Sequence, residues 1–433
     1  MRLAKAIVIA APSSGSGKTV VTLGILRALR NRGLKVASAK VGPDYIDPRF
    51  HEAATGRPCF NLDPWAMSDD TLARYLRHLS DDADIVIIEG VMGLFDGPEC
   101  GSGSTADLAA KFGLPLGLVI DSSSMGQSIA ALVRGFAETA GDGRISALIL
   151  NKVASDKHER ILRNAIGGAD LVLGAVRRDT ALALPSRHLG LVQAGERDGL
   201  EEFLEKVAAL VDRAVDLDAL LQAALPLTVS TDKSRPLAPL GKKIAVASDI
   251  AFAFAYPHML HDWTLGGAAI STFSPLADEP PPGSADAIFL PGGYPELHAA
   301  RLAANSNFMQ GLRQAAAAGK LVYGECGGFM VLGDYIVDKN GQRHPLAGLL
   351  PLGTSFADRK LHLGYRILEP LKGAPFPLPM RGHEFHYSTI DWQGEADPLF
   401  DASDASETLL GNIGLRRANV MGSYAHVIAP EAE

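Results

Sequence analysis

Cysteine is scarce in this sequence of 433 residues, which contains only Cys59, Cys100 and Cys326. Three scattered thiols cannot build a disulfide framework or a metal cluster, so each is either buried filler or a reactive group. Apolar runs of the roughly 18 residues that cross a membrane are also lacking, and the first residues enter a strand pattern without the features of a signal peptide. We therefore expect a cytoplasmic protein with no membrane partner.

Positive charge is in short supply as well. The 41 Lys and Arg residues are outnumbered by 49 Asp and Glu residues, and the net charge of −8 argues against nucleic acid as the main partner. The length exceeds that of a usual single core, whereas 47% apolar and 21% charged residues are ordinary for a soluble globular chain. Residues 226–241 carry Pro, Ser, Thr, Asp and Lys without an apolar period. They form the expected linker between domains at 1–225 and 242–433.

The start of the chain carries a chemical signature. Residues 4–11 form an apolar, β-branched run, residues 12–19 are a loop of small residues that ends in Gly-Lys-Thr, and residues 20–32 repeat apolar residues at helical spacing. A strand, a small-residue loop and a helix in this order are typical of a phosphate-binding unit. The alternative is a Gly/Ser turn before an ordinary helix, and the joint occurrence of all three features disfavours it.

Each residue type in this loop has a chemical role. Gly15 and Gly17 allow backbone N–H groups to close around phosphate oxygens at a helix N-terminus. Lys18 can reach the β- and γ-phosphates, and the Thr19 hydroxyl can ligate Mg²⁺. The strict pattern has Gly where this chain has Pro12, so the loop is a variant. It predicts binding of a nucleoside triphosphate such as ATP.

Strand and helix patterns alternate through the rest of the first half, which predicts an α/β fold with a doubly wound, mostly parallel sheet. A helix pattern at 201–222 closes this domain. The further predicted strands are residues 35–41, 84–90, 115–121, 146–153 and 173–176.

Polar residues follow several of these strands, and open α/β sheets bind ligands outside the carboxyl ends of their strands. Lys40, Asp44 and Asp47 are therefore site candidates, with a polar turn as the alternative for each. Glu89 ends a buried strand, where an acid is predicted to hold Mg²⁺ or its waters. Asn151 ends another strand and could read a purine edge through its amide, although a lone Asn at a strand end is also common.

The second half has its own signature. A strand at 287–290 runs into a Gly-Gly loop, in which Gly293 can present its backbone N–H to an oxyanion. A strand at 320–325 reaches a sharp turn at Cys326, and an apolar helix follows. This is the layout of a nucleophile elbow with sulfur in place of hydroxyl. We expect the helix N-terminus to lower the pKa of the thiol and the amide of Gly327 to serve the oxyanion.

A cysteine nucleophile needs a base. Two stretches stand out: residues 422–426 follow a predicted strand, and residues 381–388 are rich in polar groups, although alternation along a strand would send His and Glu to opposite faces. The residue pattern leaves both open. The candidates are His344, His362, His383, His386 and His426.

Three motifs of the second half resemble the glutaminase domain of class I glutamine amidotransferases: Gly-Glu-Cys-Gly-Gly at Cys326, Pro-Gly-Gly-Tyr-Pro-Glu at Gly292, and Gly-Ser-Tyr-Ala-His ending at His426. The N-terminal half resembles the dethiobiotin synthetase type of ATPase. Together they are similar to the cobyrinic acid a,c-diamide synthases of cobalamin biosynthesis, a family that includes the hydrogenobyrinic acid enzymes of the aerobic pathway. Residues 40–48, 89–97, 185–191 and 381–388 also resemble family signatures.

This resemblance implies a P-loop domain joined to a flavodoxin-like glutaminase domain. It implies that Cys326 forms a thioester with glutamine and releases ammonia, that His426 is the base, and that Gly293 and Gly327 stabilise the oxyanion. The usual acid two residues after the histidine is replaced here by Ile428, so the group that orients the histidine is open. The N-terminal domain would use Mg-ATP to phosphorylate a substrate carboxylate, and ammonia would displace the phosphate.

The implied substrates are a corrin polycarboxylate, glutamine and ATP, and the resemblance allows a homodimer. Because a polyanion must bind to a protein of negative net charge, we expect a locally basic face near the phosphate loop. The alternatives are amidation of nickel-sirohydrochlorin, cobyric acid synthesis, or a P-loop regulatory or partitioning ATPase whose C-terminal domain only binds. The assigned residues are Gly15, Gly17, Lys18, Thr19 and Asn151 for the nucleotide, Thr19, Asp44 and Glu89 for the metal, and Lys40, Asp44, Tyr45, Ile46, Arg187 and His188 for the substrate.

Overall fold

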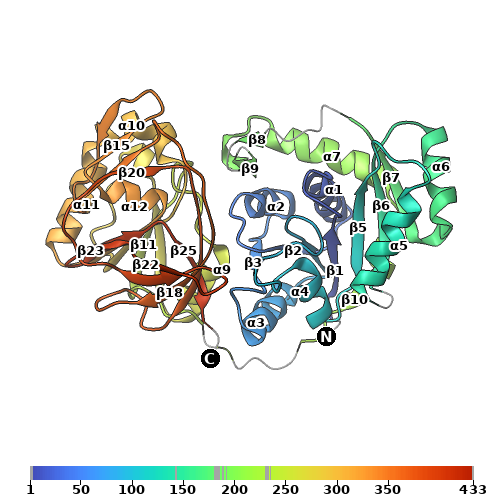
Figure 1. Ribbon diagram of the computed structural model, residues 1–433, viewed down its shortest axis with the longest axis horizontal. Coiled ribbons are helices and arrows are strands. Elements are labelled where there is room, and N and C mark those ends of the chain that lie inside the picture. The colour runs from blue at the N-terminus through green and yellow to red at the C-terminus, as the bar shows by residue number, and fades with distance from the viewer. Residues whose placement is uncertain are drawn as a thin grey trace. The chain divides into compact units, whose positions relative to one another are not determined.

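The chain folds into two compact units, Met1–Ser234 and Arg235–Glu433 (Figure 1). The structure is a computed structural model, and it describes residues 3–141, 144–179, 186–187, 190–191, 193–229, 234 and 236–431. The division falls inside the stretch predicted as a linker. None of the helices in the described ranges is long and apolar enough to cross a membrane.

The first unit is built on an eight-stranded sheet in which seven strands run parallel, in the order β3-β2-β4-β1-β5-β6-β7. All residues of β2 and β4 are buried, as expected for a sheet that is covered on both faces. The strands are β1 (Lys5–Ala10), β2 (Val36–Val41), β3 (Phe60–Leu62), β4 (Ile85–Glu89), β5 (Leu116–Asp121), β6 (Ile145–Val153), β7 (Val172–Arg177) and β10 (Leu225–Pro226). The parallel, doubly wound α/β prediction is confirmed.

Helices link these strands, and α1 packs closely against α2 and α7 (Figure 1). Gly24 makes the approach of α1 to α7 possible, because a Cβ atom on it would lie 2.3 Å from Val211 Cγ2. The α-helices are α1 (Lys18–Asn31), α2 (Asp47–Thr55), α3 (Asp69–Ser80), α4 (Thr105–Lys111), α5 (Ile129–Ala140), α6 (Asp156–Ile166), α7 (Leu200–Ala214) and α8 (Leu217–Ala223). Short 3₁₀ turns at Ala169–Leu171 and Ala194–Glu196 and a hairpin of β8 (Ser186–Arg187) and β9 (Gly190–Leu191) complete this unit.

Two boundaries differ from the predicted ones. The single helix predicted at 201–222 is wrong, because Val215 bridges to Gly174 of β7 and the Asp216 side chain caps a new helix through the Ala219 N–H. The first unit also extends beyond residue 225, since β10 pairs with β1 and the Leu227 N–H donates to the Ala4 carbonyl.

The second unit has a six-stranded sheet in the order β12-β11-β13-β14-β24-β23. The five strands before β23 are parallel and follow the order 2-1-3-4-5 of flavodoxin-like sheets. These strands are β11 (Lys243–Ala247), β12 (Ala269–Phe273), β13 (Ala287–Leu290), β14 (Leu321–Glu325), β24 (Val420–Ser423) and the antiparallel β23 (Leu415–Arg417). The helices are α9 (Pro257–Leu265), α10 (Ala299–Ala304), α11 (Ser306–Ala317) and α12 (Gly327–Leu332), with 3₁₀ turns at Pro275–Ala277 and Pro295–His298.

Two further sheets in this unit were not predicted from the sequence. The four-stranded sheet has the order β16-β15-β17-β20, and the antiparallel five-stranded sheet has the order β22-β21-β18-β19-β25. Their strands are β15 (Tyr335–Val337), β16 (Arg343–Pro345), β17 (Leu352–Ser355), β18 (His362–Pro370), β19 (Met380–His386), β20 (Thr389–Gln393), β21 (Phe400–Ser403), β22 (Leu409–Ile413) and β25 (His426–Pro430). The second of these sheets carries His426 and the polar stretch at 381–388.

Candidate active sites

The phosphate loop of the first unit depends on two glycines with positive φ. Gly15 has φ 79° and Gly17 has φ 83°, a region that side-chain-bearing residues rarely occupy. Gly17 also has no room for a side chain, because a Cβ atom there would lie 2.3 Å from Asn151 Nδ2. The loop therefore joins β1 to α1 with its backbone close to its neighbours, and Lys18 and Thr19 begin the helix.

Asn151 supports this loop from the end of β6. Its Nδ2 donates to the Ser16 carbonyl at 2.8 Å, and its Oδ1 accepts from the Lys152 N–H at 2.9 Å. Lys152 Nζ donates to the Gly15 carbonyl at 2.9 Å and to Asp121 Oδ2 at 2.6 Å. The amide of Asn151 is thus engaged in holding the loop, and its contact with a purine stays a prediction.

Glu89, at the carboxyl end of β4, is the centre of a buried charge cluster. Its Oε1 accepts from Lys18 Nζ at 3.1 Å, Lys40 Nζ at 2.8 Å and Thr19 Oγ1 at 2.7 Å. Its Oε2 lies 2.6 Å from His51 Nε2. Glu89 is 0% exposed, so these partners replace water around its charge.

The charges in this cluster shift one another's pKa values. Burial alone would raise the pKa of Glu89, but Lys40 and Lys18 outweigh it and hold that pKa well below its usual range. Burial opposes the charge of Lys40 too, yet Asp47 and Glu89 raise its pKa. The pKa of Lys18 is lowered by burial and by Lys40. Lys18 is therefore the cation of the cluster whose charge is least compensated, which suits it to an arriving anion.

Asp47, rather than Asp44, shares the cluster with Glu89. Asp47 Oδ2 accepts from Lys40 Nζ at 2.5 Å and from Thr19 Oγ1 at 3.3 Å. Asp44 Oδ1 instead accepts from the backbone N–H groups of Ile46 and Asp47 at 2.8 and 3.1 Å, at the start of α2. Burial and the charge of Asp47 raise the pKa of Asp44 to about 6. The sequence named both acids as candidates, but only the folded loop separates their roles.

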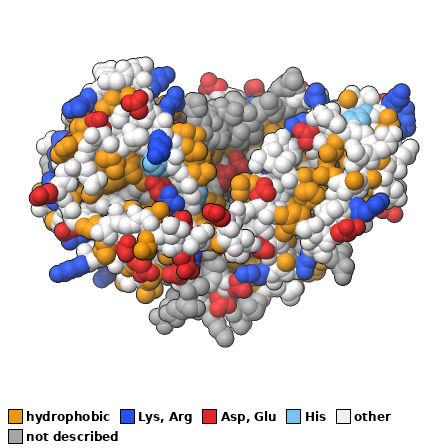
Figure 2. All heavy atoms as spheres, in the orientation of Figure 1, with side chains coloured by type: hydrophobic (Ala, Val, Ile, Leu, Met, Phe, Trp, Pro, Cys, Tyr) orange, Lys and Arg blue, Asp and Glu red, His pale blue; other side chains and the backbone are white. Residues whose placement is uncertain are grey.

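Of the residues assigned to the substrate, those with described side chains (Lys40, Asp44, Tyr45 and Ile46) do not form a basic face. Lys40 is 2% exposed and is paired with two carboxylates, so its predicted part in such a face is wrong. Tyr45 and Ile46 are each 6% exposed. Arg187 lies in β8 with its side chain not described, and His188 lies outside the described residues. On the face drawn in Figure 2, Lys and Arg side chains are scattered among Asp and Glu.

In the second unit, Cys326 stands at a strained turn between β14 and α12. Its φ of 47° and ψ of −106° are unusual for a residue that carries a side chain. The neighbouring glycines allow the turn to form, because a Cβ atom on Gly328 would lie 1.9 Å from the Leu290 carbonyl oxygen. The predicted nucleophile-elbow geometry is therefore present around the thiol.

His426, the first residue of β25, lies beside this thiol. A Cβ atom on Gly292 would lie 2.2 Å from His426 Cε1, 2.9 Å from His426 Nε2 and 3.3 Å from Cys326 Cβ. The imidazole and the cysteine therefore flank the same glycine. Of the five candidate histidines, His426 is the one that the described contacts place against Cys326.

Glu325 is the residue that the sequence analysis missed. It is 1% exposed, and its Oε1 accepts from the Tyr323 hydroxyl at 3.0 Å and from the Val427 N–H at 3.1 Å. Its Oε2 lies 3.8 Å from His426 Nδ1. Burial raises the pKa of Glu325 to about 8. Its position directly before Cys326 could have identified it as a partner of the catalytic pair. The acid was instead expected two residues after His426, where this chain has Ile428.

The protonation of the Cys326–His426 pair differs from the prediction. Burial, followed by the negative charge of Glu296, raises the pKa of the Cys326 thiol, and the Gly327 N–H does not offset this. Burial lowers the pKa of His426 to about 3. The expectation of a thiol acidified by the helix is therefore wrong, because α12 is short and desolvation is larger. The resting pair is a neutral thiol beside a neutral imidazole.

Gly293 and Gly327 lie close together near the turn at Cys326, and their role as oxyanion donors stays a prediction. The Gly327 N–H faces the Cys326 sulfur, and a Cβ atom on Gly327 would lie 3.0 Å from the Gly293 nitrogen. Gly293 itself cannot carry a side chain, because its Cβ would lie 2.0 Å from the Ala251 carbonyl oxygen. The loop after β13 and the start of α12 thus bring both candidate oxyanion donors close together.

Comparisons with known proteins match both units. Residues 7–192 match the family model of the CobQ/CobB/MinD/ParA nucleotide binding domain, and residues 243–433 match that of the CobB/CobQ-like glutamine amidotransferase domain. A hydrogenobyrinate a,c-diamide synthase of a Sinorhizobium species is 54% identical over 425 residues, 98% of each chain. Those of Rhizobium meliloti strain 1021 and Mesorhizobium japonicum are 53% and 48% identical over 98% of this chain and 98% and 99% of their own lengths.

Proposed function

Because this chain belongs to the family of hydrogenobyrinate a,c-diamide synthases, we propose that it amidates the a and c carboxylates of hydrogenobyrinic acid, with ATP as activator and glutamine as nitrogen donor. It is a glutamine-dependent ligase that forms carbon–nitrogen bonds. The observation that supports the chemistry best is the presence in one chain of a thiol at a nucleophile elbow and a phosphate loop with a buried acid. The first can release ammonia, and the second can activate a carboxylate.

In the glutaminase reaction, Cys326 transfers its thiol proton to His426 Nε2 as the sulfur attacks the side-chain amide carbon of glutamine. The resulting oxyanion accepts hydrogen bonds from the N–H groups of Gly293 and Gly327. When the carbon–nitrogen bond breaks, His426 returns the proton to the departing amine, which leaves as ammonia. Water then cleaves the thioester and gives glutamate.

Glu325 is the positioning residue that takes the place of the acid missing at Ile428. Its Oε2 is 3.8 Å from His426 Nδ1, so a small side-chain adjustment makes a hydrogen bond between them. In its ionised form, Glu325 keeps a proton on Nδ1 and the Nε2 lone pair toward sulfur, and it stabilises the imidazolium that forms in the reaction. The imidazolium in turn gives the buried Glu325 the counter-charge that its environment otherwise lacks.

In the activation reaction, the substrate carboxylate oxygen attacks the γ-phosphorus of ATP, ADP departs, and an acyl phosphate forms. Ammonia then attacks the acyl carbon, and phosphate leaves as the amide forms. Lys18 binds the β- and γ-phosphate oxygens and offsets charge as the bond to ADP breaks. Thr19, Asp47 and Glu89 offer oxygen donors, a set that suits Mg²⁺, and when bound this ion supplies charge neutralisation at the phosphates.

The decisive experiment separates ammonia supply from carboxylate activation. Cys326→Ser is expected to lose glutamine-dependent amidation and to keep ATP-dependent amidation when ammonium salt supplies free NH₃. Mass spectrometry of the corrin product reads two successive amides. Cys100→Ser is the matched control, because that thiol is exposed and belongs to the first unit. If Cys326→Ser still uses glutamine, the assignment of the second unit is overturned.

The same assay defines the substrate. Hydrogenobyrinic acid is expected to give a higher kcat/KM than its cobalt complex, cobyrinic acid, or nickel-sirohydrochlorin. A preference for cobyrinic acid or for nickel-sirohydrochlorin would make that metal complex the proposed substrate instead. The cytoplasmic location and the homodimer expected from the sequence stay predictions, and light scattering during size-exclusion chromatography measures the latter.

A further inference from the structure

The hairpin of β18 and β19 gathers polar side chains that the proposed reaction does not use. The register pairs His362 with His386 and Gly364 with Glu384. Residues two apart on a strand share a face, so Glu384 and His386 lie on the same side of the sheet as His362. His and Glu of this stretch were expected on opposite faces of the strand. This is true of His383, which is buried on the face opposite Glu384, but it is wrong for His386, which lies on the same face as Glu384.

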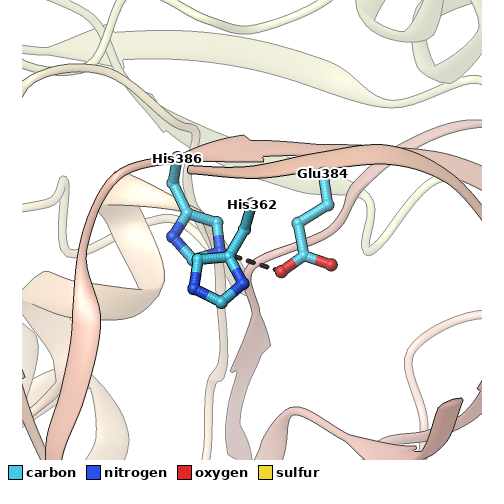
Figure 3. Close-up of side chains that lie close together, drawn as sticks. All are labelled: His362, Glu384 and His386. Carbon is cyan, nitrogen blue, oxygen red and sulfur yellow. Dashed lines mark hydrogen bonds and ion pairs between the residues drawn. The ribbon is translucent and has the colours of Figure 1, made fainter. Parts of the chain in front are cut away.

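The three side chains converge in a small cluster (Figure 3). One nitrogen of each imidazole and one oxygen of Glu384 all lie within 4.8 Å of one another. His386 Nε2 is 2.8 Å from Glu384 Oε1. The rings of His362 and His386 are stacked, with 4.7 Å between centroids and 7° between planes. This arrangement directs two imidazoles and a carboxylate toward one small volume.

Surrounding groups hold His386 and Glu384 in that orientation. The His386 Nδ1 lies 3.0 Å from the Ser388 carbonyl oxygen, which can only accept a hydrogen bond, and the ring packs on Tyr424 with 3.8 Å between centroids. Glu384 Oε2 accepts from Arg366 Nε at 2.7 Å, which leaves Oε1 toward the histidines. Metal-binding histidines and carboxylates are typically fixed by such hydrogen bonds from their second atoms.

The hydrogen-bond geometry also leaves a place for a metal ion between the two side chains. If His386 Nδ1–H donates to the Ser388 carbonyl, the Nε2 lone pair points at Glu384 Oε1. A lone pair and a carboxylate oxygen repel each other at 2.8 Å unless a proton or a metal ion lies against both. The Ser388 hydroxyl, 3.2 Å from Nδ1, is the competing partner of that nitrogen.

We propose that His362, Glu384 and His386 form a binding site for a divalent transition-metal ion of the zinc class. Two imidazoles and one carboxylate are a common donor set for Zn²⁺ with one coordination position left open. Bonds of about 2.1 Å put tetrahedral ligand atoms roughly 3.3 Å apart. His386 and Glu384 therefore separate slightly, and His362, which is only partly buried, rotates inward. The ion joins β18 to β19 beside the glutaminase site.

The test is a binding measurement on the full chain after removal of metal with a chelator. Zn²⁺ is titrated against a chromophoric competitor, and one equivalent per chain is expected for the wild type. His362→Gln and Glu384→Gln should each weaken binding more than about tenfold, a loss seen even for outer-shell partners of metal sites. His344→Gln is the matched control, because that histidine pairs with Asp338 on another sheet of the same unit.

Two controls keep the result specific. Cys326→Ser should bind Zn²⁺ as the wild type does, and Co²⁺ in place of Zn²⁺ should give an absorption spectrum without thiolate charge transfer. Equal thermal unfolding of all variants in chelator shows that lost binding is not lost folding. Undiminished Zn²⁺ affinity in His362→Gln and Glu384→Gln, or loss of binding in Cys326→Ser, would overturn the proposal.

Discussion

The two candidate active sites manage charge in opposite ways. In the first unit, Lys18 and Lys40 surround Glu89, and the charges are present before any substrate arrives. In the second unit, Cys326 and His426 are both buried and neutral at rest, and Glu325 has a raised pKa. A phosphate site must neutralise a ligand that is always anionic, so a built-in charge cluster suits it. A thiol site needs its charge only during reaction.

This contrast predicts that the Cys326 thiol reacts slowly when no amide is bound beside it. A neutral thiol is a poor nucleophile, and the ion pair with His426 forms only when a bound amide gives the developing oxyanion its N–H donors. Glutamine whose amide does not reach these N–H donors is then expected to be hydrolysed slowly. The charge cluster of the other unit has no such switch, because its ion pairs are formed before a substrate binds.

The largest effect is expected when the phosphate cluster loses its poorly compensated cation. Lys18→Ala should reduce amidation by at least about 10³-fold with either glutamine or ammonia, because both routes need the acyl phosphate. Glutaminase activity should persist. Mass spectrometry of the product and ADP release measure the loss of amidation. Lys35→Ala is the control, because Lys35 forms an exposed ion pair with Asp82. If Lys18→Ala amidates as fast as the wild type, the charge cluster has only a structural role and is not a phosphate site.

A smaller effect is expected at the other site. Glu325→Gln keeps the shape of the side chain but removes the carboxylate at His426 Nδ1, so the imidazolium loses its counter-charge. We expect kcat for glutamine hydrolysis to fall about 10- to 100-fold, which is no more than the lower end of the roughly 10²- to 10⁴-fold contribution of a general base, because the base itself is kept. KM for glutamine and ammonia-dependent amidation should be unchanged. Glu369→Gln, exposed on β18, is the control. An unchanged kcat would show that Cys326 and His426 act as a dyad.

The last expected effect concerns stability at extreme pH rather than the rate of either reaction. Burial opposes a charge on His51, but Cys59 and Glu89 raise its pKa to about 10, above its unfolded value. Its contribution is therefore complete below about pH 6.5 and is lost as pH rises toward 10. Burial lowers the pKa of His426 to about 3, so its contribution is complete above about pH 6.5 and is lost as pH falls. The first unit should weaken in alkali and the second in acid.

Hydrogen exchange with mass spectrometry measures the two units separately. Each histidine should change the free energy of unfolding of its own unit by up to about 1.4 kcal/mol per pH unit inside its window. His51→Gln should flatten the alkaline slope of the first unit, and His426→Gln the acid slope of the second, where His383 also contributes with a pKa lowered to about 3 by burial. If the free energy of unfolding depends on pH in the same way in both units, the proposed electrostatic difference between them is wrong.

Local patterns were enough to predict six of the seven parallel strands of the first unit, whereas β3, with three residues, was not predicted. Parallel strands with buried faces are continuous apolar runs, and Gly17 with Lys18 and Thr19 marks the loop directly. The second unit was harder, because short antiparallel strands such as β15 and β16 carry three residues each and show no period. The break at Val215 depends on pairing with β7, a contact distant in sequence.

The candidate sites show the same limit. Cys326 and His426 could be named from their motifs, whereas Glu325 acquires its meaning only from a 3.8 Å distance between β14 and β25. The choice between Asp44 and Asp47 likewise depends on how the loop enters α2. The acidity of Cys326 could not be predicted from a helix N-terminus, because burial is a property of the whole unit.

The backbone at Cys326 has a consequence for how this enzyme can change over evolution. A residue with φ 47° and ψ −106° carries strain of about 1–3 kcal/mol, and glycine at that position would release most of it. Folding alone therefore favours loss of the nucleophile, and only the demand for ammonia retains it. In a lineage that obtains free ammonia, a change from cysteine to glycine would be opposed only by the small cavity that the lost side chain leaves in the core. The second unit could then persist in a folded form that no longer releases ammonia.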